Sequence, residues 1–107
     1  MATRSLIALK TKNTFENIYC HWDGYPDHML GKLQGYYNTI DKVKTLLADG
    51  DRSTIEPDSK LYKESSSQAK TLLDLKKQAI DCNAEWVYVY DNDSKTWQHF
   101  ETKDKKW

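Results

Sequence analysis

The distribution of hydrophobic and polar residues along this chain predicts strands at both ends and helices between them. Near the start, two apolar or aromatic runs at residues 6–9 and 17–22 flank a polar segment at residues 10–14. Runs of strand length on either side of a polar turn predict a β-hairpin over residues 3–22. A second hairpin is predicted over residues 85–101, where β-branched and aromatic residues are dense.

In the middle of the chain, apolar residues recur at helical spacing. The predicted helices cover about residues 28–37, 39–49 and 65–82. Asp27 and Thr39 are suitable N-caps for the first two helices, and Ser65 with Gln68 forms a capping-box pattern for the third. Gly50 and Asn83 are natural stops for the second and third helices.

Gly31 and Gly35 lie inside the first predicted helix, where glycine lowers helix propensity. We interpret them as sites where this helix packs closely on the hairpin. Residues 51–64 contain Pro57 and few apolar residues, so they predict a loop.

These elements predict an α+β fold, with an antiparallel sheet of about four strands and three helices packed on one face. The other face of that sheet would be open to water or to a partner. The length of 107 residues suits a single domain over residues 1–107, with a frayed tail at residues 102–107.

Charge limits the classes of partner. Sixteen Lys and Arg balance sixteen Asp and Glu, which gives a formal net charge of zero. Direct DNA binding and attachment to a membrane surface both need an excess of cations on one face, so neither is expected. No apolar run reaches the length of about 20 residues that spans a membrane.

The two cysteines, Cys20 and Cys82, do not form a CxxC pair, and the start of the chain lacks the apolar core of a secretory signal. We therefore expect reduced, buried thiols in a cytoplasmic protein, in the host cytoplasm if a phage encodes it. No metal or other cofactor is expected, although scattered Cys20, His21 and Cys82 are the residues from which a zinc site would have to be built.

Residues 18–27 contain the densest chemistry of the chain. In a strand, neighbouring side chains point to opposite faces, so Cys20 and His21 cannot form a nucleophile–base pair. If Ile18 and Cys20 face the core with Trp22, then His21 shares the other face with Tyr19 and Asp23, where a carboxylate could orient the imidazole. The pattern equally allows a purely structural role, in which Trp22 and Tyr25 fill the junction between sheet and helix.

The C-terminal hairpin offers a weaker candidate. Tyr88, Tyr90, Trp97 and His99 could stack on bases, as single-strand binders do, but acidic residues surround them. Cross-strand aromatic pairs that stabilise a small sheet are the preferred interpretation.

Several short motifs together resemble one family of proteins. They are MATRS at residues 1–5, IYCHWDGYP at 18–26, YNT at 37–39, KV at 42–43, GDRS at 50–53 and EWVYVY at 85–90, followed by Trp97. The chain is similar in these motifs to small uncharacterised proteins encoded by bacteriophages, prophages and bacterial mobile elements. The resemblance implies an origin and no activity, and it does not cover the loop at residues 56–63.

From this resemblance and from the aromatic residues, we expect an accessory protein that acts by binding, for example as an inhibitor of a host defence factor. The candidate contact residues are Arg4, His21, Trp22, Asp23, Tyr25 and Asp27. The alternative is a ligand-binding domain or enzyme that uses His21, Asp23 and Arg4 on a phosphate- or carboxylate-bearing molecule, such as one that resembles a nucleotide. A third class is a homo-oligomer that pairs through the open sheet face.

Overall fold

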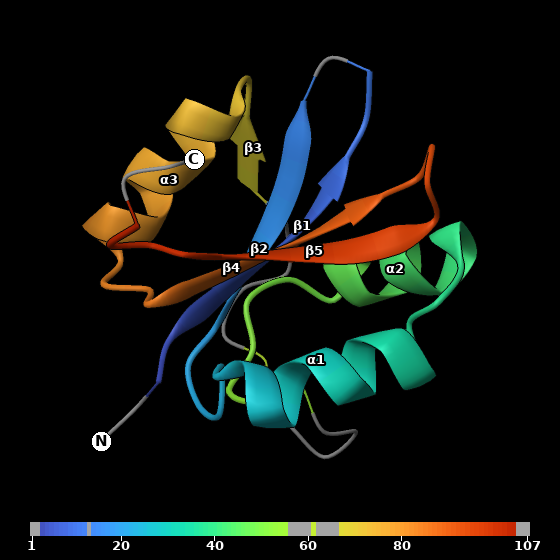
Figure 1. Ribbon diagram of the computed structural model, residues 1–107, viewed down its shortest axis with the longest axis horizontal. Helices are drawn as coiled ribbons and strands as arrows, with labels where there is room; N and C mark the ends of the chain where they lie inside the picture. Colours follow the sequence, from blue (N-terminus) through green and yellow to red (C-terminus); the bar gives the residue numbers. More distant parts are fainter. Residues whose placement is uncertain (1–2, 13, 56–60, 62–66, 105–107) are drawn as a thin grey trace.

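A five-stranded sheet forms the centre of the molecule, with strand order β3-β2-β1-β4-β5 (Figure 1). The computed structural model describes residues 3–12, 14–55, 61 and 67–104. The elements are β1 (Ser5–Lys10), β2 (Phe15–Cys20), α1 (Pro26–Gly35), α2 (Ile40–Ala48), β3 (Ser67–Ala69), α3 (Leu72–Asp81), β4 (Trp86–Asp91) and β5 (Thr96–Glu101).

The predicted α+β class is confirmed, with three helices in the described residues, and so are both hairpins. The sheet differs from the predicted arrangement of about four antiparallel strands in two details. The sheet is mixed, because β1 and β4 pair in parallel, with Ser5 opposite Trp86. It also has a fifth strand, β3, which pairs antiparallel with β2 through Phe15 and Ala69.

The helices cover both faces of the sheet, although the sequence analysis placed them on one. Ile7 and Leu9 of β1 pack in the cluster that includes residues of α1 and α2. Leu6 and Ala8 of the same strand pack in the cluster that includes residues of α3. Figure 1 shows α3 on one side of the sheet and α1 with α2 on the other. The open sheet face expected as an oligomer contact therefore does not exist over these strands.

The first two helices lie close to their predicted positions. Helix α1 starts earlier than predicted because Pro26 occupies its first turn, and Tyr25 is its N-cap residue without a side-chain hydrogen bond. Asp27, the predicted cap, lies in that first turn. In α2, the Thr39 hydroxyl accepts a hydrogen bond from the Lys42 backbone N–H at 3.3 Å, as predicted for an N-cap.

The third helix is shorter than predicted. Its N-cap is Thr71, whose hydroxyl accepts from the Asp74 N–H at 3.1 Å, so the N-cap lies six residues after Ser65, the predicted one. Ser65 lies outside the described residues, and Gln68 belongs to β3. Asn83 ends the helix as predicted, with φ of 61°, and the Ala84 N–H donates to the Ala79 carbonyl at 2.8 Å.

Two further predictions need correction. A Cβ atom at Gly31 or Gly35 would meet nothing within 4 Å, so close packing does not explain these glycines. Thr102, predicted to lie in a frayed tail, is buried, and its N–H donates to the Glu85 carbonyl at 2.9 Å. Among the described residues, no helix is long and apolar enough to cross a membrane.

Candidate functional site

The predicted contact residues meet at one end of the sheet. Antiparallel pairing of β1 with β2 places Ser5 opposite Cys20, so Arg4 lies beside the residues that follow β2. The connection from β2 to α1 then returns to the start of the chain, where the Gly24 N–H donates to the Thr3 carbonyl at 2.9 Å. Residues far apart in the sequence are thus brought to the same end of the sheet.

Gly24 fixes the path of this connection. A Cβ atom at Gly24 would lie 2.7 Å from the Thr3 carbonyl oxygen and from both side-chain atoms of Ser5, which is closer than real Cβ contacts. The buried Tyr88 hydroxyl donates a hydrogen bond to the Gly24 carbonyl at 2.5 Å. Asp23, next to it, has φ of 58°, a left-handed conformation in which aspartate is tolerated. The turn is therefore held by the segment before β1 on one side and by β4 on the other.

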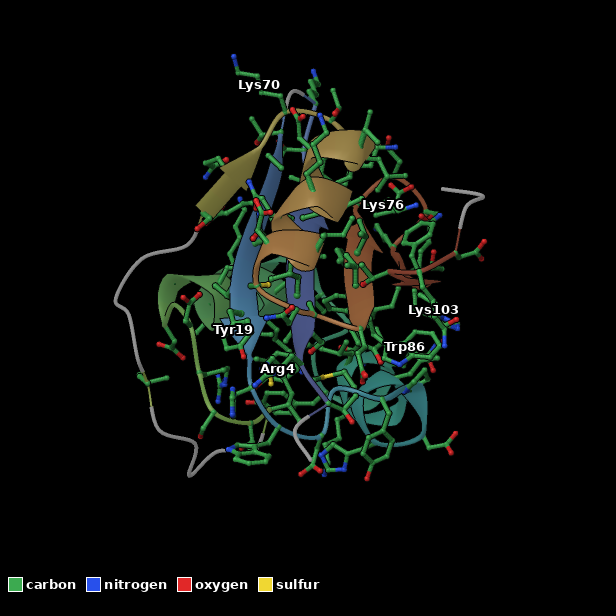
Figure 2. All side chains as sticks on the ribbon, turned by 90° about the vertical axis from the view of Figure 1, so that its left-hand side faces the viewer. Arg4, Tyr19, Lys70, Lys76, Trp86 and Lys103 are labelled. Atoms are coloured by element: carbon green, nitrogen blue, oxygen red, sulfur yellow. The ribbon has the colours of Figure 1, made fainter. Side chains whose placement is uncertain are left out.

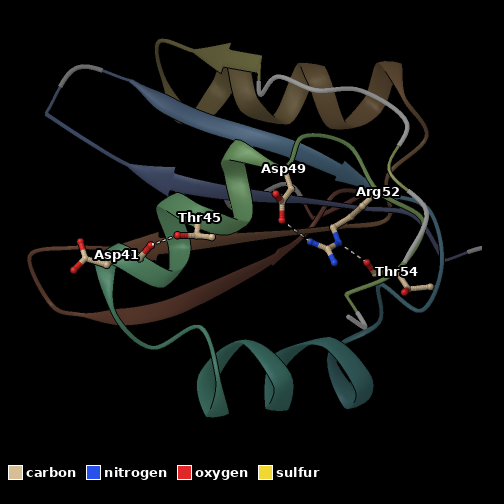
Figure 3. A network of polar contacts seen from close by, with 5 residues as sticks. All are labelled: Asp41, Thr45, Asp49, Arg52 and Thr54. Carbon is tan, nitrogen blue, oxygen red and sulfur yellow. Dashed lines mark hydrogen bonds and ion pairs between the residues drawn. The ribbon is translucent and has the colours of Figure 1, made fainter. Parts of the chain in front are cut away.

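Arg52 holds the same connection from a third side. Its carbonyl accepts from the His21 N–H at 3.1 Å, and the neighbouring Ser53 carbonyl accepts from the Trp22 N–H at 2.8 Å. The Arg52 side chain is buried, and its Nε donates to the Thr54 carbonyl at 2.6 Å, with Asp49 at 3.9 Å (Figure 3). Sequence analysis missed this residue, for which the GDRS motif was the available signal.

Arg4 and His21 meet at the hydroxyl of Tyr19, which was predicted to share a face with His21 but was not among the predicted contact residues. The Tyr19 hydroxyl and His21 Nδ1 share a hydrogen bond of 2.7 Å. Burial raises the pKa of Tyr19, and the adjacent Arg4 guanidinium opposes that rise by its charge and by a hydrogen bond. Asp23 was the expected partner of this imidazole, but β2 ends at Cys20 and the left-handed Asp23 breaks the strand alternation.

The remaining predicted residues form an exposed surface. We define the loop surface as Trp22, Asp23, Tyr25 and Asp27. The Trp22 and Tyr25 side chains are 44% and 41% exposed, and both carboxylates are exposed. The Trp22 ring stands edge-on to the His21 ring at 4.6 Å, and the Tyr25 ring lies 5.9 Å from that of His28. Trp22 thus does not join the core with Ile18 and Cys20.

A groove of about 710 Å³ lies where the end of α3, the start of β4 and the end of β5 meet the residue before β1. Arg4, Trp86 and Lys103 are among its lining residues. Viewed towards α3, these three side chains and Tyr19 lie near the C-terminal end of that helix, and Lys70 lies at the opposite end (Figure 2). The loop surface residues do not line this groove.

The two cysteines and three of the C-terminal aromatic residues lie fully or partly inside the protein. Both cysteines are free, and burial raises the pKa of Cys20 to about 11. In the described part of the chain, no group of three or more His, Cys, Asp or Glu is placed to hold a metal ion. Tyr88, Tyr90 and Trp97 are buried, which agrees with cross-strand packing rather than base stacking.

Comparison of the chain with protein-family models, with curated protein sequences and with solved structures found no match.

Proposed function

We propose that this protein acts by binding a protein partner through the loop surface. The observation that carries the proposal is the exposure of two large aromatic side chains, Trp22 and Tyr25, on a backbone held from three sides. Aromatic side chains dominate the energetics of protein interfaces. A backbone fixed before binding loses little conformational entropy when the complex forms.

The charges of the loop surface indicate what kind of partner fits. Asp23 and Asp27 flank the two aromatic side chains and are exposed. A partner with an apolar pocket bordered by Lys or Arg would complement them, and such complementarity would raise the association rate. Sequence resemblance to phage and prophage proteins supports a host protein, such as a defence factor, as the partner.

The proposal is tested by capture from a bacterial host lysate with three forms of the protein. We expect the wild type to retain a partner in stoichiometric amount, and the Trp22→Ala/Tyr25→Ala variant to lose it. Tyr36→Ala is the matched control, because Tyr36 is 61% exposed but lies at the other end of α1. Equal retention by the double variant and the wild type, or no retention by any form, would contradict the proposal.

A second candidate function is the binding of a small molecule that bears a phosphate or carboxylate, with or without catalysis. The observation that favours it is the convergence of Arg4 and His21 on the Tyr19 hydroxyl, beside a groove that Lys103 also lines. A guanidinium binds such anions through two parallel hydrogen bonds. Asp23 has no place in this arrangement.

Titration with inorganic phosphate and with acetate, followed by amide NMR shifts, tests this second function. Saturable shifts at Arg4, Tyr19 and His21 are expected, and they should weaken in Arg4→Gln. Lys70→Gln is the control, because Lys70 is exposed near the opposite end of α3. Shifts that are absent, or that are equal in Arg4→Gln and the wild type, would exclude an anion site at Arg4.

A further inference from the structure

The groove that Arg4 lines has walls from three separate segments of the chain, and hydrogen bonds join these segments. The Glu85 N–H donates to the Arg4 carbonyl at 2.8 Å, and the Thr102 N–H donates to the Glu85 carbonyl at 2.9 Å. The groove volume of about 710 Å³ lies within the range of small-molecule sites. Walls that are fixed before binding lower the entropic cost of holding a ligand between them.

The charged residues that line the groove limit the charge of a ligand that fits it. Arg4 and Lys103 contribute two cations, and Glu85 and Glu101 contribute two carboxylates. A polyphosphate chain would bring several negative charges near both carboxylates, which would repel them. A ligand with one anionic group, and with hydrogen-bond donors for the carboxylates, complements this mixture better.

Arg4 is the cation best placed to bind that anionic group. Its guanidinium hydrogen-bonds to Tyr19. A guanidinium has five N–H donors, so this contact leaves others for a phosphate. In the view of Figure 2, Arg4 lies towards Tyr19, whereas Lys103 lies beside Trp86. The anionic group and the aromatic surface of the groove are therefore at different ends of it.

Trp86 gives the groove its aromatic surface. The Trp86 side chain is partly buried, because it packs against the core cluster that contains residues of α1, and its ring lies 6.1 Å from the His99 ring. It nevertheless lines the groove, together with Ile80 of α3, which is 54% exposed. Nucleic-acid bases stack on aromatic side chains, and this stacking contributes strongly to affinity. Trp86 and Ile80 thus suit a flat heterocyclic ring.

We propose that the groove binds a nucleoside monophosphate, with the base against Trp86 and the phosphate at Arg4. The proposal rests on the anion site of the second candidate function, and it adds the chemical group that carries the anion. Ribose hydroxyls and base amino groups donate hydrogen bonds, which suits the two carboxylates that line the groove. The loop surface residues do not line the groove, so a nucleotide and a protein partner would occupy different sites.

Calorimetric titration with AMP, ribose 5-phosphate and adenosine separates the contributions of the base and the phosphate. We expect AMP to bind about tenfold more tightly than either fragment. Trp86→Leu should weaken AMP binding about tenfold and leave ribose 5-phosphate binding unchanged, whereas Arg4→Gln should weaken both. Trp22→Leu is the matched control, because Trp22 is 44% exposed but does not line the groove.

Nuclear Overhauser effects in the wild type provide a second test that needs no substitution at the partly buried Trp86. We expect contacts between the base protons of AMP and the Trp86 indole. AMP that binds no more tightly than ribose 5-phosphate, or base protons without contacts to Trp86, would overturn the proposal but not the anion site at Arg4. Adenosine that binds as tightly as AMP, or no binding of any of the three compounds, would exclude the anion site as well.

Discussion

Gly24 is closely surrounded by other atoms, whereas Gly31 faces open space. The loop surface therefore requires a glycine at position 24. A side chain at Gly24 would collide with the Thr3 backbone and with Ser5, whereas the same atom at Gly31 would meet open space. Gly31 lies within α1, where glycine costs conformational entropy relative to alanine.

The two alanine substitutions should therefore have opposite effects on the free energy of unfolding. We expect Gly24→Ala to destabilise the protein by roughly 1–3 kcal/mol, as overpacking does. Gly31→Ala should stabilise it by about 0.5–1 kcal/mol through helix propensity. Urea denaturation of both variants measures this difference, and a Gly24→Ala variant as stable as the wild type would contradict the described path of the turn.

Cys20 should make stability depend on pH under alkaline conditions. Burial raises its pKa from an ordinary value of 9.0 to about 11, so the folded protein holds this proton more tightly than the unfolded chain. The contribution of the buried, protonated Cys20 thiol to the free energy of unfolding is complete below pH 9. It is lost as the pH rises towards 11, because only the thiol of the unfolded chain ionises between these two values.

We expect the free energy of unfolding to fall between pH 9 and 11, and to fall less steeply in Cys20→Ala. Cys82→Ala is the control, because Cys82 is only half-buried whereas Cys20 is buried. Denaturation at several pH values measures the slopes. Identical slopes for Cys20→Ala and the wild type would show that another group causes the dependence.

At the scale of elements, the Tyr88 hydroxyl links β4 to the connection between β2 and α1. It is buried and donates to the Gly24 carbonyl. Removing the hydroxyl leaves that carbonyl without this donor, which typically costs about 1–3 kcal/mol. The conformation of the loop surface thus depends on a strand that is distant in the sequence.

Tyr88→Phe should accelerate amide hydrogen exchange at residues 22–25 while the sheet stays protected. Tyr36→Phe serves as the control because Tyr36 is exposed. If exchange at residues 22–25 is the same in Tyr88→Phe and the wild type, then the hydroxyl does not hold the turn.

Local patterns predicted the hairpins and the Thr39 cap, because each depends on residues close in the sequence. The parallel pairing of β1 with β4 depends on the whole intervening chain and left no local signal. Residues 6–9, however, are apolar without alternation, which is typical of a strand buried on both faces. That run could have placed helices on both sides of the sheet.

Only those parts of the candidate site that depend on residues close in the sequence were predicted. Trp22, Asp23 and Tyr25 are neighbours in one motif, and Arg4 was brought near them by the predicted hairpin. Strand alternation placed Tyr19 on the same face as His21, but Tyr19 was not chosen as a contact residue because the hydrogen bond between its hydroxyl and His21 Nδ1 depends on side-chain positions that the pattern does not specify. Arg52 contacts His21 from the segment after α2, so spacing alone could not place it.

At the scale of the whole molecule, helices cover both sheet faces, which leaves loops, grooves and strand edges for contacts. The total charge is zero, but negative charge is present locally, because carboxylates flank the aromatic side chains of the loop surface. We infer that recognition uses shape and aromatic contact at the β2–α1 connection, with charge setting orientation.

Hydrogen exchange of the protein alone and in complex with its captured partner tests this central claim most directly. We expect slower exchange for amides at residues 21–29 in the complex, with no change at residues 83–86 and 101–104 around the groove. Unchanged exchange at residues 21–29, with protection only elsewhere on the molecule, would contradict the assignment of the loop surface as the contact site.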